Sequence, residues 1–202
     1  MTDSNFDAIW DKITSHIFGQ IHKPEAEVLF KRALESNIGC YVEIGAFQGL
    51  STAVLAEAAK ISDGGVLSID PFIPGYEDPG NPGTDAHQEF KKNIFPEYSH
   101  YVISIPLTSR EALASTFFDP ILPGAFIDVL FIDGDHEYEA VKFDIEHFAP
   151  LVRSGGYIIF DDYNNHAALP GVKKAVDELL SEWETTDDVW NIIAKRKPWR
   201  SY

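Results

Sequence analysis

The sequence is poor in cysteine and in basic residues, and each shortage excludes a class of protein. Cys40 is the one cysteine among 202 residues, which excludes an internal disulfide framework and a cysteine-rich zinc site. Lysine and arginine number 16 against 32 aspartate and glutamate residues, so the formal net charge is −16 at pH 7. Because a nucleic-acid surface needs a stripe of basic side chains, this balance predicts no nucleic-acid partner.

Long apolar runs are missing as well. No run reaches the roughly 18–20 residues needed to cross a bilayer, so the sequence predicts no membrane partner. The first residues, MTDSN, lack the basic region and apolar stretch of a signal peptide, and we therefore expect a cytoplasmic protein. A hydrophobic content of 45% is sufficient for a packed core in a chain of this length.

Two helical segments open the chain. Apolar residues recur at helical spacing from Phe6 to Ile17, and Gly19 can end that helix. Pro24 suits the first turn of a second helix. We predict a helical cap over residues 1–37 that packs on a domain over residues 38–202.

From residue 39 onward, short apolar strands alternate with helical segments. The predicted strands are 41–45, 66–70, 101–105, 127–132, 157–160 and 189–194. The predicted helices are 50–60, 86–95, 109–117, 138–148 and 172–183. Strands that are apolar throughout are buried on both faces, which predicts an α/β, Rossmann-like, open and mostly parallel sheet with helices on both faces. Ligands of such sheets bind beyond the carboxyl ends of the strands.

The first predicted strand ends in a glycine turn that follows an acid. Glu43 stands two residues before Gly45, and Gly49 comes four residues later, just before the next helix. Glycines allow a tight turn and a close approach of the backbone to a ligand. The segment lacks the G-x-G-x-x-G of dinucleotide folds, and an anionic Glu43 suits a cationic ligand better than a pyrophosphate. An ordinary strand-to-helix turn is the alternative.

The second predicted strand ends in Asp70. An acid at this point is well placed to accept hydrogen bonds from both hydroxyls of a ribose. A turn or capping role beside Pro71 is the alternative. Together with the glycine turn, Asp70 favours ribose binding.

Three more acids follow the fourth and fifth predicted strands. Asp133 follows the fourth strand, and the pair Asp161 and Asp162 follows the fifth. Neighbouring parallel strands bring these tips together, and packed carboxylates repel one another unless a cation lies between them. Carboxylate oxygens favour Mg²⁺, Ca²⁺ or Mn²⁺. The alternative is that Asp135 and Asp162 cap the segments that follow them.

One histidine and two loops lie beside these acids. His136 has a side-chain pKa near neutrality and is a candidate general base, or else a surface residue at the start of a helix. The loop over residues 71–86 is long enough to be a lid or binding loop, and residues 164–171 are a second candidate for a substrate wall.

The glycine turn resembles that of the class I S-adenosylmethionine-dependent methyltransferases. The commoner form of their first motif has a further glycine where this chain has Phe47. The catechol and caffeoyl-coenzyme A O-methyltransferase branch shares that departure, and Gly45, Gly49 and Ser51 match its turn. The resemblance covers roughly residues 38–195. The cofactor-binding residues that it implies are Glu43, Gly45, Ala46, Phe47, Gly49, Ser51, Asp70, Ser109 and Asp133.

The acids at the later strand ends carry the resemblance further. Metal-dependent O-methyltransferases have an aspartate after the fourth strand and an Asp-Asp or Asp-Asn pair after the fifth, which Asp133, Asp161 and Asp162 match. The Asp-Gly-Asp-His and Asp-Asp-Tyr motifs are similar to those of the macrocin O-methyltransferase group. The resemblance also implies a seven-stranded sheet with a final antiparallel strand, for which residues 183–186 and 189–194 form a hairpin with its turn at Asp187-Asp188.

We therefore predict transfer of the methyl group of S-adenosylmethionine to a hydroxyl of a small molecule. The transfer is an in-line displacement, so catalysis is mostly alignment. A divalent cation, Mg²⁺ first among the candidates, held by Asp133, Asp161 and Asp162 would orient the acceptor and lower its pKa, and His136 or Asp133 would take the proton. The sequence leaves open a metal-free methyltransferase, a nicotinamide-dependent oxidoreductase and a cofactor-binding protein without activity. It also leaves open the acceptor and a homodimer.

Overall fold

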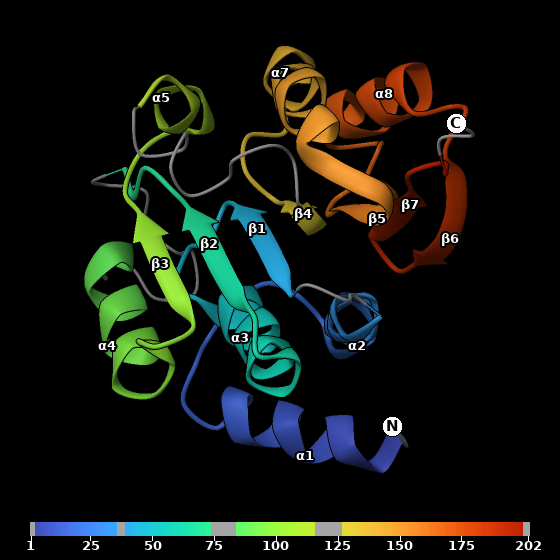
Figure 1. The fold of residues 1–202 in the computed structure, drawn as a ribbon. Helices are drawn as coiled ribbons and strands as arrows, with labels where there is room; N and C mark the ends of the chain where they lie inside the picture. The colour runs from blue at the N-terminus through green and yellow to red at the C-terminus, as the bar shows by residue number, and fades with distance from the viewer. Residues whose placement is uncertain (1–2, 36–38, 74–83, 116–126, 200–202) are drawn as a thin grey trace.

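The computed structural model describes residues 3–35, 39–73, 84–115 and 127–199. Its centre is a seven-stranded sheet in the order β3-β2-β1-β4-β5-β7-β6 (Figure 1). The strands are β1 Cys40–Ile44, β2 Gly65–Ile69, β3 Val102–Ile105, β4 Ile127–Ile132, β5 Val152–Phe160, β6 Glu184–Val189 and β7 Ile192–Arg196. The first five strands pair in parallel, and β7 runs antiparallel between β5 and β6. The predicted fold class is confirmed.

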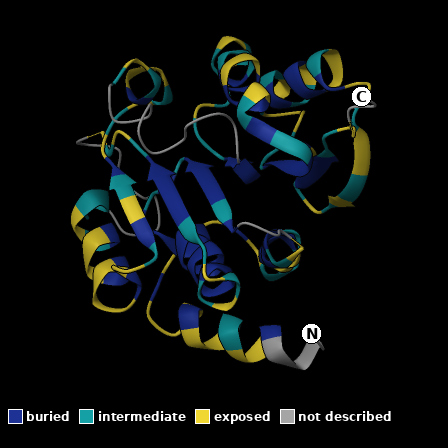
Figure 2. Ribbon diagram, viewed as in Figure 1, coloured by how far each residue is buried: buried dark blue, intermediate teal, exposed yellow. Residues whose placement is uncertain are grey.

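Helices cover both faces of the sheet. The helices are α1 Asp3–Thr14, α2 Lys23–Leu34, α3 Leu50–Ser62, α4 Ala86–Tyr98, α5 Ser109–Ala114, α7 Tyr138–Phe148, the 3₁₀ turn η1 Ala149–Leu151 and α8 Pro170–Leu179. The first four form one hydrophobic core with the sheet, and α5, α7 and α8 form the other. Figure 2 shows the central strands buried between these layers.

Strand β1 shows why the sheet has two cores. Its side chains alternate between the two faces, so Tyr41 packs in the core of α2 and α3 while Val42 and Ile44 pack in the core of α7 and α8. A strand with apolar residues on both faces has to be covered on both sides, as the sequence predicted. Glu43 is the polar exception, and it points to the α3 side.

The two helices predicted at the N-terminus are α1 and α2, which pack into the same core as β1 and α3. Pro24 lies in the first turn of α2, as predicted. Residues 36–38, where the boundary between the cap and the following domain was predicted, lie outside the described residues.

Two predicted features near the C-terminus are wrong in detail. The strand predicted over 157–160 begins earlier, at Val152, so that Gly155 and Gly156 lie inside β5, where the pairing with β4 changes register. The hairpin turn lies at Trp190 and Asn191 rather than at Asp187-Asp188, which belongs to β6. Asp187 and Asp188 fit in β6 because it is the edge strand of the sheet, and edge strands tolerate charged residues. Trp190 has a φ of 54°, a left-handed conformation that propensity assigns to glycine or asparagine.

Among the described residues, no helix combines the length and the apolar composition that a membrane span requires.

Candidate active site

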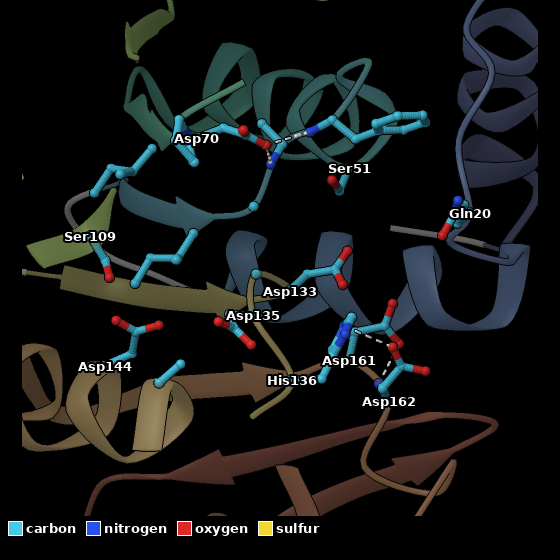
Figure 3. A pocket seen from close by; sticks show the side chains of 18 of the residues that line it. Gln20, Ser51, Asp70, Ser109, Asp133, Asp135, His136, Asp144, Asp161 and Asp162 are labelled. Atoms are coloured by element: carbon cyan, nitrogen blue, oxygen red, sulfur yellow. Dashed lines mark hydrogen bonds and ion pairs between the residues drawn. The ribbon is translucent and has the colours of Figure 1, made fainter. Parts of the chain in front are cut away.

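A cavity of about 1080 Å³ opens at the carboxyl ends of β1, β2, β4 and β5 (Figure 3). This is the edge where open parallel sheets bind their ligands. Pockets for one small molecule measure roughly 300–1,000 Å³. The cavity is therefore large enough to hold a cofactor beside a second small molecule.

The turn after β1 forms one wall of the cavity. Gly45 has a φ of 91°, and a Cβ at this position would lie 2.0 Å from the carbonyl oxygen of Asp133. Only glycine therefore lets this turn approach the end of β4. Phe47 has a φ of 46° without being glycine, and strained backbone of this kind is typical of ligand-binding turns. Gly45, Phe47 and Ser51 line the cavity, whereas Gly49 does not.

Asp70 lines the cavity and also holds this turn in place. Its Oδ2 accepts hydrogen bonds from the backbone N–H groups of Ala46 and Phe47, at 2.8 and 2.9 Å. Its Oδ1 accepts a hydrogen bond from the N–H of Phe72 at 2.6 Å. A carboxylate has about four acceptor positions, so roughly one is left for a ligand hydroxyl. The sequence predicted ribose binding by Asp70 but gave no sign of its role in the turn.

Glu43 lies behind the glycine turn and is not among the residues that line the cavity. It is fully buried, and its Oε2 accepts hydrogen bonds from Thr52 Oγ1 at 2.5 Å and Ser68 Oγ at 2.9 Å. Burial raises the pKa of Glu43 to about 7, against the lowering effect of the neighbouring hydroxyls. The structure therefore places Glu43 where it anchors the start of α3 to β1 and β2.

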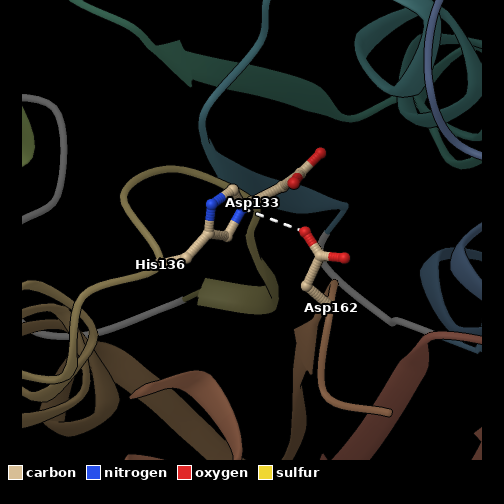
Figure 4. Close-up of side chains that lie close together, drawn as sticks. All are labelled: Asp133, His136 and Asp162. Carbon is tan, nitrogen blue, oxygen red and sulfur yellow. Dashed lines mark ion pairs between the residues drawn. The ribbon is translucent and has the colours of Figure 1, made fainter. Parts of the chain in front are cut away.

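The acids that follow β4 and β5 meet at one end of the cavity. One ligand atom each from Asp133, His136 and Asp162 lies within 4.8 Å of the others (Figure 4). His136 Nε2 lies 3.0 Å from Asp162 Oδ2. Asp161 lines the cavity beside this group, and its Oδ1 accepts a hydrogen bond from the N–H of Asp162 at 2.8 Å. All four residues were predicted site residues, but the structure groups His136 with the candidate metal ligands.

The titration of these groups reflects crowded negative charge. Burial and the neighbouring carboxylates of Asp161 and Asp162 raise the pKa of Asp133 well above its usual range. Burial raises the pKa of Asp161 to about 7. The close contact between His136 and Asp162 lowers the pKa of Asp162 and raises that of His136. Acids that disfavour each other's ionisation in this way are suited to a shared cation.

Segments from both ends of the chain complete this part of the cavity. Glu25 of α2 is 1% exposed and lines the cavity with Gln20 and Asn191. Its Oε2 accepts a hydrogen bond from the N–H of His22 at 2.6 Å, and its Oε1 accepts one from the N–H of Asn191 at 3.0 Å. Glu25 therefore joins the start of α2 to the β6–β7 turn. Nothing in the spacing of the sequence marked Glu25, Gln20 or Asn191 as site residues.

The β6–β7 turn is also tied to the loop after β5. Asn164 Nδ2 donates hydrogen bonds to Asp188 Oδ1 at 2.7 Å and to the carbonyl oxygen of Trp190 at 2.8 Å. The Trp190 ring is 61% exposed and packs against the His22 ring, with centroids 5.1 Å apart. An aromatic pair thus lies next to Asn191, which lines the cavity.

The two predicted loops have different positions. Pro71, Phe72 and Ile73 line the cavity, and residues 74–83 lie outside the described residues. Residues 164–171 are not among those that line it, and His166 is exposed. The prediction that residues 164–171 form a substrate wall is therefore wrong for the cavity described here, since their contribution is the tie that Asn164 makes.

The end of the cavity farthest from the acid group is formed by α5 and α7 (Figure 3). Ser109 lines it, as predicted. Asp144 of α7 also lines it and was missed, because an acid on a helix is usually a solvated surface residue.

The strand order, the glycine turn and a cavity at the carboxyl ends define a class I S-adenosylmethionine-dependent methyltransferase fold. A family model described as a methyltransferase domain matches residues 42–163, and the chain belongs to this family.

The chain is also similar in sequence to one known protein and in fold to two solved structures. An uncharacterized protein of Acanthamoeba polyphaga mimivirus is 32% identical over 175 residues, covering 84% of this chain and 73% of that protein. The O-methyltransferase NovP has a similar structure, with a TM-score of 0.67, 20% identity, and coverage of 96% of this chain and 98% of NovP. The O-methyltransferase TomG from Streptomyces achromogenes, in complex with SAM, gives a TM-score of 0.61, 18% identity, and coverage of 98% and 91%.

Proposed function

We propose that the protein transfers the methyl group of S-adenosylmethionine to a hydroxyl group of a small molecule. The observation that carries this proposal is one continuous cavity that joins the turn held by Asp70 to the group of Asp133, His136 and Asp162. The first part suits the nucleoside of the cofactor, and the second suits the acceptor. The structural similarity to O-methyltransferases, one of them in complex with SAM, supports both halves.

The charge of the cavity fits a cationic cofactor. Acidic residues dominate its lining: Glu25, Asp70, Asp133, Asp135, Glu137, Glu139, Asp144, Asp161 and Asp162. Arg110 is the one lysine or arginine among the described residues that line it. The sulfonium of S-adenosylmethionine carries a positive charge, so this lining attracts the charged cofactor more strongly than its neutral-sulfur product. The backbone of residues 45–47, Ser51 and Asp70 would hold its methionine and ribose parts.

The acid group fits a divalent cation as well. Two carboxylates and an imidazole form a donor set that Mg²⁺, Mn²⁺ or Ca²⁺ can share, with Mg²⁺ favouring the oxygens. When bound, such a cation lowers the pKa of the acceptor hydroxyl and orients it. The ligands would be Asp133, His136 and Asp162, while Asp161 is left beside them to accept the proton of the acceptor hydroxyl.

The proposal is tested by two measurements on the purified protein. Titration calorimetry with S-adenosylhomocysteine should show binding, and absence of binding would refute the cofactor assignment. Transfer of labelled methyl groups to a panel of sugars, phenols and other small hydroxyl compounds should then fall after EDTA treatment and return with Mg²⁺ or Mn²⁺. Transfer that is unchanged by EDTA would leave the methyltransferase assignment intact and remove the metal.

A further inference from the structure

Asp144 is a buried acid at the end of the cavity away from the acid group. It belongs to α7, is 4% exposed and points toward Ser109 at the start of α5 (Figure 3). The Ser109 hydroxyl lowers the pKa of its carboxyl group, against the raising effect of burial. The Asp144 Oδ1 atom is buried and has no hydrogen-bond partner among the described residues. Buried polar atoms are nearly always paired in native proteins, so an unpaired carboxylate oxygen at a cavity wall indicates a missing donor.

The surroundings of Asp144 suit a flat ring. The Arg110 guanidinium lies 3.8 Å from the centre of the Phe143 ring, and both residues line this end of the cavity with Thr108 and Ala140. Because Arg110 stacks on Phe143, no ion pair is formed between Arg110 and Asp144 in the described part of the chain. Arg110 and His147 therefore act on the carboxylate through their charge alone, and neither donates a hydrogen bond to it in the part of the chain that the structure describes.

The position of Asp70 decides which part of the cofactor reaches this end. In Figure 3, Ser109 and Asp144 lie on the left of the cavity and the acid group lies on the right, while Asp70 lies on the wall above them, on the side of Ser109. In the proposed function the ribose lies at Asp70 and the reacting sulfonium faces the acid group. The base is attached to the other side of the ribose, so it has to occupy the α5–α7 end.

We propose that Asp144 accepts a hydrogen bond from the exocyclic amino group of the adenine and so selects an amino purine against an oxo purine. Ser109 favours the ionised form of this carboxylate, which is the form that accepts the bond. This inference rests on the proposed function, since it needs the cofactor to be an adenine nucleoside.

The chemistry of the two purines makes the selection strong. An ionised carboxylate only accepts hydrogen bonds, the C6 amino group of adenine donates them, and the C6 oxygen of hypoxanthine accepts them. A hypoxanthine ring would therefore place two acceptors against each other in a buried site, and such sites reject the mismatched analogue. Burial raises the pKa of Asp144 to about 6, so at about pH 7.5 the group is ionised.

The experiment compares two ligands on three proteins. Titration calorimetry at about pH 7.5 gives the dissociation constants of S-adenosylhomocysteine and of its deaminated analogue, S-inosylhomocysteine. The proteins are the wild type, Asp144→Asn and, as a matched control, Glu146→Gln, which changes an exposed acid on the same helix. Thermal melting of all three shows that they are folded.

We expect the wild type and Glu146→Gln to prefer the adenine compound by at least about tenfold. In Asp144→Asn the preference should fall to within about threefold, because an amide can accept from the amino group or donate to the oxo group. Equal binding of both compounds by the wild type, or full preference in folded Asp144→Asn, would overturn the role of Asp144. If the wild type binds neither compound, the proposed cofactor itself is wrong.

Discussion

The two ends of the cavity differ in where their residues come from. Under the proposed function, the cofactor end comprises the turn after β1, Asp70 and Ser109, all within the residues 42–163 that match the family. The acceptor end adds Gln20 and Glu25 from before that segment and Asn191 from after it. The acid group of the acceptor end lies within the shared segment too, so we expect that segment to supply the cofactor site and the acid group, and the segments on both sides of it to shape only the remaining space beside that group.

The largest effect is expected where the two ends meet. Asp162→Asn removes one charge from the candidate metal ligands and weakens the contact with His136. Loss of metal ligands and of the groups that orient them commonly costs 10–100-fold or more, so we expect methyl transfer to fall by about 10²–10³-fold. The dissociation constant of S-adenosylhomocysteine should stay within about twofold, because Asp162 belongs to the acceptor end.

The control for this variant is Glu182→Gln, which changes an exposed acid after α8. It should leave both methyl transfer and cofactor binding unchanged. Loss of cofactor binding in Asp162→Asn would contradict the separation of the two ends, because it would show that Asp162 also supports the cofactor site.

Glu43 makes the stability of the cofactor end dependent on pH. Burial raises its pKa from 4.5 to about 7. The folded protein therefore holds this proton more tightly than the unfolded chain, and the stabilisation is full below about pH 4.5 and lost as the pH rises through about 7. A shift of this size corresponds to about 3 kcal/mol.

Urea unfolding of the wild type and of Glu43→Gln between about pH 4.5 and 8 measures this effect. The wild type should lose stability relative to Glu43→Gln as the pH rises, since glutamine carries no proton to lose. Parallel curves for the two proteins would show that Glu43 does not titrate in this range. Because Glu43 does not line the cavity, we expect no change in the acceptor KM of Glu43→Gln.

Substitution of Asp70 tests whether the turn after β1 and cofactor binding depend on the same carboxylate. Asp70→Ala removes the acceptors for the N–H groups of Ala46, Phe47 and Phe72 together with the predicted ribose contact. We expect S-adenosylhomocysteine to bind about 10–100-fold more weakly, or about 1–3 kcal/mol. The matched control is Asp63→Asn at the exposed C-cap of α3, where the left-handed backbone tolerates asparagine. Wild-type affinity in Asp70→Ala would refute the assignment.

The same difference between the two ends explains how much the sequence could predict. Apolar strands and their order along the chain predicted the parallel sheet, and every residue predicted at a strand end lies at one edge of it. Asp70, Asp133 and Asp161 could be found because parallel strands end at the same edge. These predictions depend on local pattern and on one rule of topology.

The remaining site residues depend on tertiary contacts that no local pattern records. Glu25 looks like an ordinary acid in the first turn of a helix, and its bond to Asn191 spans 166 residues. Asp144 looks like a solvated residue on α7, and only the packing of α5 against that helix buries it. The turn at Trp190 was missed because a tryptophan with positive φ contradicts residue preference.

Glu25 is a test of the acceptor end alone. Glu25→Gln leaves one amide oxygen to accept from the N–H groups of His22 and Asn191, so one of the two bonds is lost. We expect a loss of about 1–2 kcal/mol in unfolding free energy and a several-fold rise in the KM of whichever acceptor the panel identifies. Binding of S-adenosylhomocysteine should be unchanged. If it weakened as much as acceptor binding, Glu25 would not act on the acceptor end alone.

Trp190 is expected to have the smallest effect on stability and a selective effect on the acceptor. Trp190→Gly relieves a φ of 54° but removes the ring that packs on His22. Relief of left-handed strain and loss of one aromatic contact are each worth about 1 kcal/mol, so the melting temperature should change little. Glycine would therefore serve the turn as well as tryptophan does, so the turn does not explain the exposed ring, and its contact with His22 is the feature to test. A rise in acceptor KM without a change in S-adenosylhomocysteine binding would place the His22–Trp190 pair in the acceptor site. An unchanged KM in this folded variant would limit that site to the cavity itself.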